Sequence, residues 1–362
     1  MQKLRGVETS LFYIDTTPKI DYVKGIERGI KMKIDVIIPA YKAQNTIIRT
    51  LSSIAMQSIV KDIKVSIVND ADGIGYKKFV DMFKPFMDIQ ELVMDKNGGP
   101  GDARQFGIDH TDNPLLTFID ADDTFAGAYA LHILRSSLLK EQENACVFSS
   151  FIEENINNTF ITHQNDGVWM FGKIYKRDFI NKYKVRFKEG SRANEDAGFN
   201  MICKLCSNQQ ERIKYLQDTT YFWHFKEDSI TRINKGQYSY DQSYVGYTDN
   251  MIYALKYVEG MNPFNNQVML TKVMVMCNLY EYWIETDARD KRFKEQNWNC
   301  AKLYYNEVYK EIEPKISDEV LAEVYNEIMR GAYAGNKLFK IIPSMGIKEF
   351  LTKLKSEVEC KS

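Results

Sequence analysis

The sequence predicts an α/β fold in which a mostly parallel central sheet is flanked by helices and followed by a helical C-terminal region. Between residues 33 and 121, short runs of Val, Ile and Leu alternate with stretches whose apolar residues recur at helical spacing. Continuous apolar runs of this length suit strands covered on both faces. Their alternation with helices is typical of parallel sheets with right-handed crossovers. After residue 233 strand signals are few, and apolar residues recur at intervals of three and four.

Four segments have the composition of buried strands: residues 33–40, 63–70, 91–96 and 114–121. Three segments between them have helical periodicity: residues 45–57, 75–86 and 101–110, with Asn45 as the expected N-cap of the first. Ligands of such sheets bind beyond the carboxyl ends of the strands. The candidate site is therefore formed by the residues that end these strands: Pro39, Tyr41, Asn69, Asp70, Asn97, Asp120 and Asp122.

These patterns divide the chain into an N-terminal extension at residues 1–32, an α/β domain at 33–232 and a helical region at 233–362. The formal net charge of −1 gives no global electrostatic reason to expect binding to nucleic acid or to an anionic membrane. The N-terminus lacks the apolar core of a signal peptide, and no apolar run reaches the ~18 residues of a membrane span. We therefore expect a cytoplasmic protein without a transmembrane segment.

The segment FIDADDTF, residues 118–125, places three carboxylates directly after a predicted buried strand. Asp120 and Asp122, at positions i and i+2, can turn to the same side of a loop and share a hard divalent cation. Without a cation, mutual repulsion would raise the pKa of at least one carboxyl group. A structural alternative is that Asp122 or Asp123 caps a helix beginning near Ala126. The motif alone does not separate these two interpretations.

Several ordered motifs together resemble the inverting glycosyltransferases of family 2, which have the GT-A fold. These motifs are VIIPAYKAQNTIIRTLSSIAMQS, VSIVNDAD, NGGPGDARQFGI, LLTFIDADDTF, VWMFGKIYKRDFI, FKEGSRANEDAGFN and YFWHFKEDSITR. They cover approximately residues 33–232. The resemblance implies a metal-dependent enzyme that moves a sugar from a nucleotide-sugar, with a UDP-sugar as the expected donor, to a hydroxyl acceptor.

The resemblance also implies roles on the nucleotide side of the site. Pro39 and Tyr41 are expected to lie against the base, and Asp70 to accept a hydrogen bond from N3 of uracil. Such a contact selects uracil because cytosine lacks that donor. Arg104 is expected to pair with Asp120 or with the sugar diphosphate.

The acidic motif supplies the metal side by the same resemblance. Asp122 is expected to bind Mn²⁺ or Mg²⁺ directly, while Asp120 contacts the ribose or the sugar and is a second candidate ligand. His224 is placed where a side chain reaches the diphosphate or the metal, although a histidine between aromatic residues is also a common core residue. Arg232 is expected to cover the phosphates.

By the same resemblance, the remaining motifs supply the residues expected on the acceptor side of the site. Asp196 is expected to be the general base, ionised at the start of a helix, and Glu195, the other acid of the catalytic pair, to bind the acceptor. Trp169 and Lys173 match a segment that lines the acceptor side, with Trp169 as a core residue being the structural alternative.

The chain departs from the family pattern at several positions of the nucleotide side. Asn69 replaces the first Asp of the usual Asp-Asp-Gly-Ser, and Ala71 with Asp72 replaces Gly-Ser. Gln105 replaces an Asn, and Asp102 is an added acid with no assigned role. The changes at Asn69, Ala71 and Asp72 weaken the expectation that the base is uracil.

The acceptor expected first is a surface polysaccharide or a teichoic-acid-like polymer. Alternatives are a modified base in DNA, as for phage-type enzymes, which the net charge does not favour, and a protein. A non-catalytic glycan-binding module is an alternative from another class. A sugar nucleotidyltransferase is a further alternative, but such an enzyme needs a Gly-rich phosphate loop directly after the first strand, and PAYKAQN is not one. The helical region is expected to shape the acceptor groove or to form a homo-oligomer interface.

Overall fold

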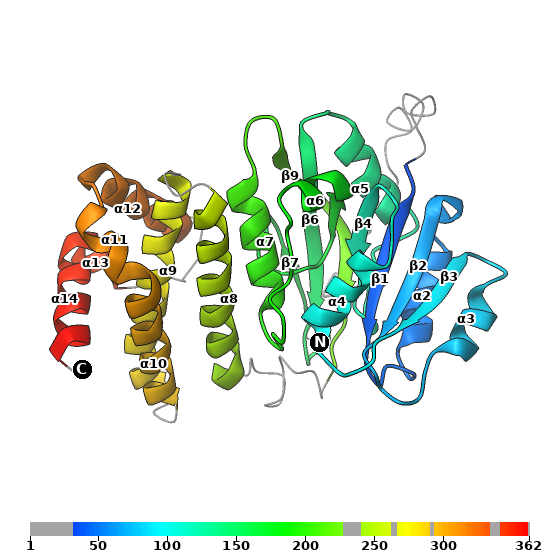
Figure 1. The fold of residues 1–362 in the computed structure, drawn as a ribbon, viewed down its shortest axis with the longest axis horizontal. Coiled ribbons are helices and arrows are strands. Elements are labelled where there is room, and N and C mark those ends of the chain that lie inside the picture. Colours follow the sequence, from blue (N-terminus) through cyan, green and yellow to red (C-terminus); the bar gives the residue numbers. More distant parts are fainter. Residues whose placement is uncertain (1–31, 227–239, 262–265, 290–292, 334–340, 361–362) are drawn as a thin grey trace, which may run out of the picture. The chain divides into compact units, whose positions relative to one another are not determined.

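The computed structural model describes residues 32–226, 240–261, 266–289, 293–333 and 341–360 (Figure 1). These residues belong to one compact unit, Met32–Ser362. Of the predicted N-terminal extension, only Met32 lies within the described residues. Among the described residues, no helix combines the length and the apolar character that crossing a bilayer requires.

The described strands form one mixed sheet. Their bounds are β1 (Ile34–Ala40), β2 (Ile63–Asn69), β3 (Asp88–Val93), β4 (Leu115–Phe118), β5 (Thr124–Phe125), β6 (Asn144–Glu154), β7 (Phe160–His163), β8 (Lys173–Lys176) and β9 (Arg212–Trp223). The order across the sheet is β3-β2-β1-β4-β8-β6-β9-β5, and β7 pairs with β6.

The parallel part of the sheet is β3-β2-β1-β4. Ala40 of β1 pairs with Asn69 of β2, and Asn69 pairs with Val93 of β3, so these strands end at one edge. Beyond β4 the pairing is antiparallel at β8, at β7 and at β5, while β6 and β9 are parallel to each other. The parallel ends therefore gather the residues after β1, β2 and β4 at one rim.

Helices cover both faces of this sheet. Their bounds are α2 (Ile47–Ala55), α3 (Lys77–Phe83), α4 (Pro100–Asp109), α5 (Ala130–Leu139), α6 (Arg177–Lys182) and α7 (Glu195–Cys206). Val36 and Ile38 of β1 are buried in a hydrophobic cluster with α2, α3 and α5. Ile37, which points to the opposite face, is buried with α4, α6 and α7.

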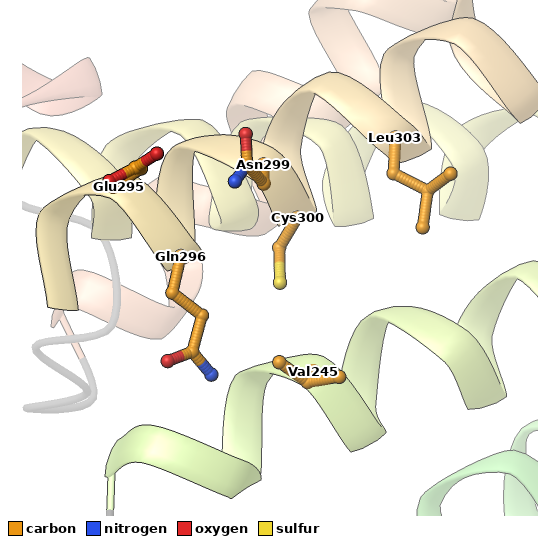
Figure 2. A pocket seen from close by; sticks show the side chains of 6 residues that line it. All are labelled: Val245, Glu295, Gln296, Asn299, Cys300 and Leu303. Carbon is orange, nitrogen blue, oxygen red and sulfur yellow. The ribbon is translucent and has the colours of Figure 1, made fainter.

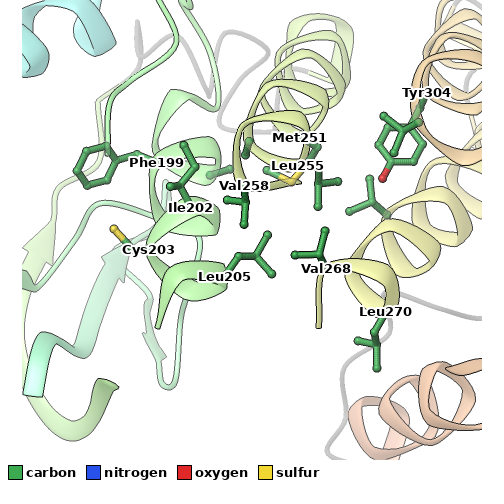
Figure 3. Close-up of a cluster of buried hydrophobic side chains, with 14 of the residues drawn as sticks. Phe199, Ile202, Cys203, Leu205, Met251, Leu255, Val258, Val268, Leu270 and Tyr304 are labelled. Carbon is green, nitrogen blue, oxygen red and sulfur yellow. The ribbon is translucent and has the colours of Figure 1, made fainter. Parts of the chain in front are cut away.

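A helical region follows the sheet domain. Its helices are α8 (Tyr240–Met261), α9 (Asn266–Arg289), α10 (Lys294–Tyr304), α11 (Lys310–Ile312), α12 (Asp318–Tyr333), α13 (Ile342–Met345) and α14 (Ile347–Cys360), with a π-helical turn at Tyr305–Tyr309. Figure 1 shows α8 beside α7, with the other helices beyond it. In Figure 3, side chains of α7 such as Ile202 and Leu205 face Leu255 of α8 and Val268 of α9. The helical region thus shares a hydrophobic core with the sheet domain.

The predicted α/β fold with a helical C-terminal region is confirmed. The sheet is mixed, with parallel pairing among the strands β1 to β4 and between β6 and β9. All four predicted strands are present, although β3 begins at Asp88 and β4 ends at Phe118. Helix α2 begins at Ile47 after Thr46, which makes no side-chain capping bond, so Asn45 is not its N-cap.

Candidate active site

The acidic turn, residues 119–123, leads from β4 into β5. The side chains of Asp120 and Asp122 keep exposed fractions of 31% and 33%, so both carboxylates are accessible at the rim. Burial, and then the neighbouring Asp120, raise the pKa of Asp122, while Lys226 acts in the opposite direction. The turn therefore presents two partly exposed carboxylates with the mutual repulsion that the sequence predicts.

Asp123 has a different environment from its two neighbours. Its Oδ2 accepts a hydrogen bond from the Tyr221 hydroxyl at 2.7 Å, and its Oδ1 accepts one from the backbone N–H of His224 at 2.9 Å. The Thr50 hydroxyl donates to the Asp123 carbonyl oxygen at 2.8 Å. No helix begins near Ala126, since α5 begins at Ala130. The helix-cap interpretation is therefore wrong, and Asp123 instead ties the acidic turn to β9.

Arg104 of α4 connects the acidic turn to the Glu195-Asp196 motif. Its Nη2 lies 2.6 Å from Asp120 Oδ1, and its Nη1 lies 2.6 Å from Glu195 Oε1. Burial alone would lower the pKa of Arg104, which is only 4% exposed, but Asp120 and Glu195 raise it above its ordinary value. The expected pairing of Arg104 with Asp120 is present. The pairing with Glu195 could not be read from the sequence.

Asp196 lies in the first turn of α7, after Asn194 in the left-handed conformation at φ 56°. Its Oδ1 accepts a hydrogen bond from the Ala197 N–H at 2.8 Å. Burial and then Glu195 raise the pKa of Asp196 to about 8, although Arg104 acts to lower it. Burial and the neighbouring Glu195 therefore act against the ionised carboxylate that the helix N-terminus is expected to favour.

Asp70, at the end of β2, is 3% exposed and holds the Gly-rich loop that precedes α4. Its carboxylate accepts hydrogen bonds from Asn97 Nδ2 at 2.9 Å, from the Gly98 N–H at 2.7 Å and from the Gly99 N–H at 2.9 Å. These donors use most of the acceptor capacity of a carboxylate. The uracil contact stays a prediction, and it requires a lone pair of the Asp70 carboxylate that these three donors do not use.

The loop after β1 is held by Asp72, one of the departures from the family pattern. Asp72 Oδ2 accepts hydrogen bonds from the Lys42 N–H at 3.2 Å and from Gln44 Nε2 at 2.6 Å. Pro39 is half-buried in β1, whereas Tyr41 on this loop is exposed. Tyr41 is thus available at the rim for an aromatic contact, and its role toward the base stays a prediction.

His224 lies next to the acidic turn with both ring nitrogens engaged. Nε2 lies 2.9 Å from the Thr124 hydroxyl, and Nδ1 lies 3.2 Å from Glu154 Oε2. Burial and then Arg49 lower the pKa of His224. A metal or diphosphate at this imidazole would have to replace Thr124 or Glu154, and the ligand role stays a prediction.

Two cations beside the acidic turn were not identified from the sequence. Lys226 Nζ lies 3.5 Å from Asp122 Oδ2, and Arg49 of α2 donates from Nη2 to the Asp122 carbonyl oxygen. Both residues lie within the matching motifs, but nothing in their spacing distinguishes them from ordinary surface cations. They place positive charge where a diphosphate is expected.

The expected acceptor-side residues are found in different settings. Trp169 is partly buried and packs on Phe171 and Trp223, with ring centroids 5.7 and 5.2 Å away. Lys173 has no exposed surface, and its Nζ lies 3.4 Å from Asp166 Oδ1. Burial lowers its pKa. Lys173 is therefore an internal residue and does not line a surface, while Arg232 lies outside the described residues.

The acidic turn has the chemistry that a divalent cation bound to a diphosphate requires. Within the described parts of the chain, no three or more His, Cys, Asp and Glu side chains are grouped to hold a metal. A Mg²⁺ ion that binds together with phosphates uses only one or two protein carboxylates and keeps several waters. The exposed oxygens of Asp120 and Asp122 fit this requirement.

A groove of about 450 Å³ lies in the helical region, between α8 and α10 (Figure 2). Figure 2 shows Cys300 and Gln296 of α10 pointing toward Val245 of α8. None of its lining residues belongs to the acidic turn or to the Glu195-Asp196 motif. The groove is therefore distinct from the candidate active site.

The chain is similar to known glycosyltransferases in sequence and in fold. Residues 35–195 match the family model described as Glycosyl transferase family 2. The chain is 25% identical over 236 residues to glycosyltransferase GlyA of Streptococcus pneumoniae, which covers 56% of this chain and 32% of that protein. It is 24% identical over 217 residues to the poly(ribitol-phosphate) beta-glucosyltransferase of Bacillus spizizenii, which covers 54% of this chain and 33% of that protein.

The fold is similar to that of S. aureus TarS residues 1–349, solved in complex with UDP-GlcNAc. The TM-score is 0.62 at 16% identity, and the match covers 84% of this chain and 88% of the TarS chain. This chain spans about one third of the length of GlyA and of the Bacillus enzyme. Residues 35–195 therefore match a glycosyltransferase family 2 domain, and the fold of the chain is similar to that of TarS.

Proposed function

We propose that the protein transfers a sugar from a UDP-sugar to a hydroxyl group of a surface polymer, with inversion at the anomeric carbon. The observation that carries this proposal is the ion-pair bridge Asp120–Arg104–Glu195. It joins the acidic turn, where a donor diphosphate is expected, to the motif that contains the proposed base. A donor site and a base held in one rigid network are what a single displacement needs.

In this proposal Asp196 removes the proton from the acceptor hydroxyl as that oxygen attacks the anomeric carbon. A pKa of about 8 makes Asp196 a stronger base than an ordinary aspartate while leaving part of it ionised near neutral pH. Arg104 holds Asp120 and Glu195 in place, and its pair with Glu195 is buried, whereas Asp120 stays partly exposed at the rim. Lys226 and Arg49 offer positive charge to the leaving diphosphate.

Asp122, with Asp120, would hold Mn²⁺ or Mg²⁺. When bound, such a cation supplies positive charge that stabilises the departing diphosphate. The accessible oxygens of the two side chains support this assignment.

The proposed acceptor is a teichoic-acid-like polymer or another surface glycan. Relatives of this chain include the poly(ribitol-phosphate) beta-glucosyltransferase and a teichoic acid poly(glycerol phosphate) polymerase of Staphylococcus epidermidis, 22% identical over 262 residues. A UDP-sugar donor is supported by the similar fold of TarS, which was solved with UDP-GlcNAc.

A donor screen tests this proposal. The purified 362-residue chain is incubated with Mn²⁺ and each of a set of nucleotide-sugars, with poly(ribitol phosphate) or poly(glycerol phosphate) present, and the released nucleotide is measured. We expect UDP release that depends on the polymer and stops when a chelator is added. Glycan binding without release of any nucleotide would instead indicate a non-catalytic module.

A further inference from the structure

The segment before the proposed base, residues 187–194, has neither helical nor strand structure of its own. We refer to it as the base loop, because it runs directly into Glu195 and Asp196. Irregular backbone takes its conformation from the elements that it contacts. The position of Asp196 therefore depends on what holds this loop.

Helix α4 holds the base loop from the side of the sheet domain. Gln105 Oε1 accepts a hydrogen bond from the Phe187 N–H at 3.1 Å, and Asp102 Oδ1 accepts one from the Gly190 N–H at 3.0 Å. Gln105 and Asp102 are both departures from the family pattern. Their contacts give each of them a role in fixing the base loop.

Helix α8, the first helix of the C-terminal region, holds the loop from the other side. The Asn250 side-chain amide is completely buried, and its Nδ2 lies 2.7 Å from Ser191 Oγ and 3.1 Å from the Ala193 carbonyl oxygen. Its Oδ1 is buried without a hydrogen-bond partner, so the side chain contributes through Nδ2. Lys188 Nζ adds an ion pair to Asp249 Oδ2 at 2.5 Å.

Two glycines allow α8 to approach the base loop and α7 closely. A Cβ on Gly246 of α8 would lie 2.4 Å from the Ala193 carbonyl oxygen, and one on Gly198 of α7 would lie 3.0 Å from Asn250 Oδ1. Gly260, near the end of the same helix α8, has nothing within 4 Å of such a Cβ. The close approach is therefore specific to the part of α8 that meets the base loop.

We propose that α8 is part of the active-site framework, with Asn250 and Gly246 as positioning residues that fix the base loop and thereby Asp196. This inference rests on the proposed role of Asp196 as the base. It assigns the helical C-terminal region a function in sugar transfer, since displacing the loop moves the base away from the acceptor. Displacements near 1 Å can cost about 100-fold in rate.

The test compares Gly246→Ala with Gly260→Ala, which are identical substitutions on one helix. Gly246→Ala is expected to lower kcat for transfer by ~10- to 100-fold and to change KM for the donor less than kcat, because the substitution acts directly on the base loop and reaches the donor side only through the Arg104 bridge. Gly260→Ala is expected to keep wild-type kcat. Equal kcat values in the two variants would overturn the proposal.

A second readout needs no substrate. Hydrogen exchange of the backbone amides of residues 191–198 is expected to be faster in Gly246→Ala than in wild type or Gly260→Ala. Unchanged exchange would count against a positioning role of α8. If the wild-type protein transferred no sugar from any donor, the proposed function would fail, and the exchange comparison would still decide whether α8 fixes the base loop.

Asn250→Ala provides an independent variant, with Asn297→Ala as its control. Both asparagines are buried in the helical region, but Asn297 lies on α10 and not against the base loop. Asn250→Ala is expected to lower kcat and to speed exchange at residues 191–198, whereas Asn297→Ala is expected to do neither. Equal effects of the two substitutions on kcat would indicate general destabilisation and contradict the proposal.

Discussion

Asp122 and Asp123 are adjacent in the sequence but have opposite surroundings. Asp122 is one third exposed beside Lys226, whereas Asp123 is buried and bonded to Tyr221 and to the backbone of His224. This difference in accessibility supports the proposed ligand role of Asp122, whereas the buried hydrogen bonds of Asp123 stabilise the turn. Substitution of either residue by Asn should therefore have different consequences.

Asp122→Asn is expected to lower transfer by at least about 10-fold, with a change in unfolding free energy within about 0.5 kcal/mol, as for other exposed positions. The loss should be partly overcome by raising the Mn²⁺ concentration, because the change weakens a proposed cation ligand. Steady-state rates across a Mn²⁺ titration and urea unfolding measure both effects. A rate that does not depend on Mn²⁺ in either protein would contradict the assignment.

Asp123→Asn is expected to destabilise the protein by ~1–3 kcal/mol, because Asn has one side-chain acceptor oxygen in place of the two that accept from the Tyr221 hydroxyl and the His224 N–H. Urea unfolding of the variant beside Asp122→Asn gives the comparison. Equal stability of the two variants would show that the buried hydrogen bonds of Asp123 contribute little.

The pH dependence of transfer reports on Asp196. The proposed base must be ionised, and burial raises its pKa to about 8, so kcat/KM should rise with pH up to that value and fall about tenfold per pH unit below it. Asp196→Asn should lower kcat by ~10²–10⁴-fold. A wild-type profile that is flat between pH 6 and 9 would exclude Asp196 as the titrating base.

At the candidate site, the sequence predicted the pairing of Arg104 with Asp120, but not the second ion pair of Arg104 with Glu195. The roles expected of Asp120, Glu195 and Asp196 came from the resemblance of their motifs to a known family, because the spacing of these acids alone left structural alternatives open. The bridge through Arg104 joins motifs far apart in the chain, and burial, which raises the pKa of Asp196, depends on the whole fold. The spacing of residues within a motif reveals neither the Arg104 bridge nor the burial of Asp196.

At the scale of elements, the first four strands were predictable and the later ones were not. β1, β2 and β4 are short apolar runs buried on both faces, which a sequence pattern reveals. β9 was missed because it alternates little and is partly exposed, and its position is set by pairing with β6 and β5. Such long-range pairing has no local signal.

Helix α4 packs closely on the sheet through Gly107. A Cβ at this position would lie 2.4 Å from Ile37 Cγ2 and 3.2 Å from Val68 Cγ2. Gly107→Ala is therefore expected to destabilise the protein by ~1–3 kcal/mol, despite the higher helix propensity of Ala. Urea unfolding measures the effect, with Gly260→Ala as the control in open space, and an unchanged midpoint for Gly107→Ala would contradict this packing.

At the scale of the whole molecule, the sheet domain and the helical region share one hydrophobic cluster across α7, α8 and α9 (Figure 3). The sequence predicted a helical region but not that its first helix packs against α7 beside the proposed base.

A shared core predicts that the sheet domain and the helical region unfold together. Unfolding in one step would show that the helical region is part of the same cooperative unit as the sheet domain, and not an independent domain.

The four tryptophans allow this to be measured, since Trp169 and Trp223 lie in the sheet domain and Trp283 and Trp298 in the helical region. Two double Trp→Phe variants, each keeping one pair, report on one region at a time by fluorescence. We expect both variants to unfold at the same urea concentration, after correction for the stability change of each. Separate midpoints would show two independent units.

The central claim is a single displacement of UDP by an acceptor hydroxyl, with Asp196 as the base. The most direct measurement is the anomeric configuration of the product, determined by proton NMR after reaction with the UDP-sugar that supports transfer, in wild type and in Asp196→Asn. We expect the wild-type protein to give a product whose anomeric configuration is opposite to that of the donor, and Asp196→Asn to give almost no product. A product that retains the configuration of the donor, or equal product from Asp196→Asn, would contradict it.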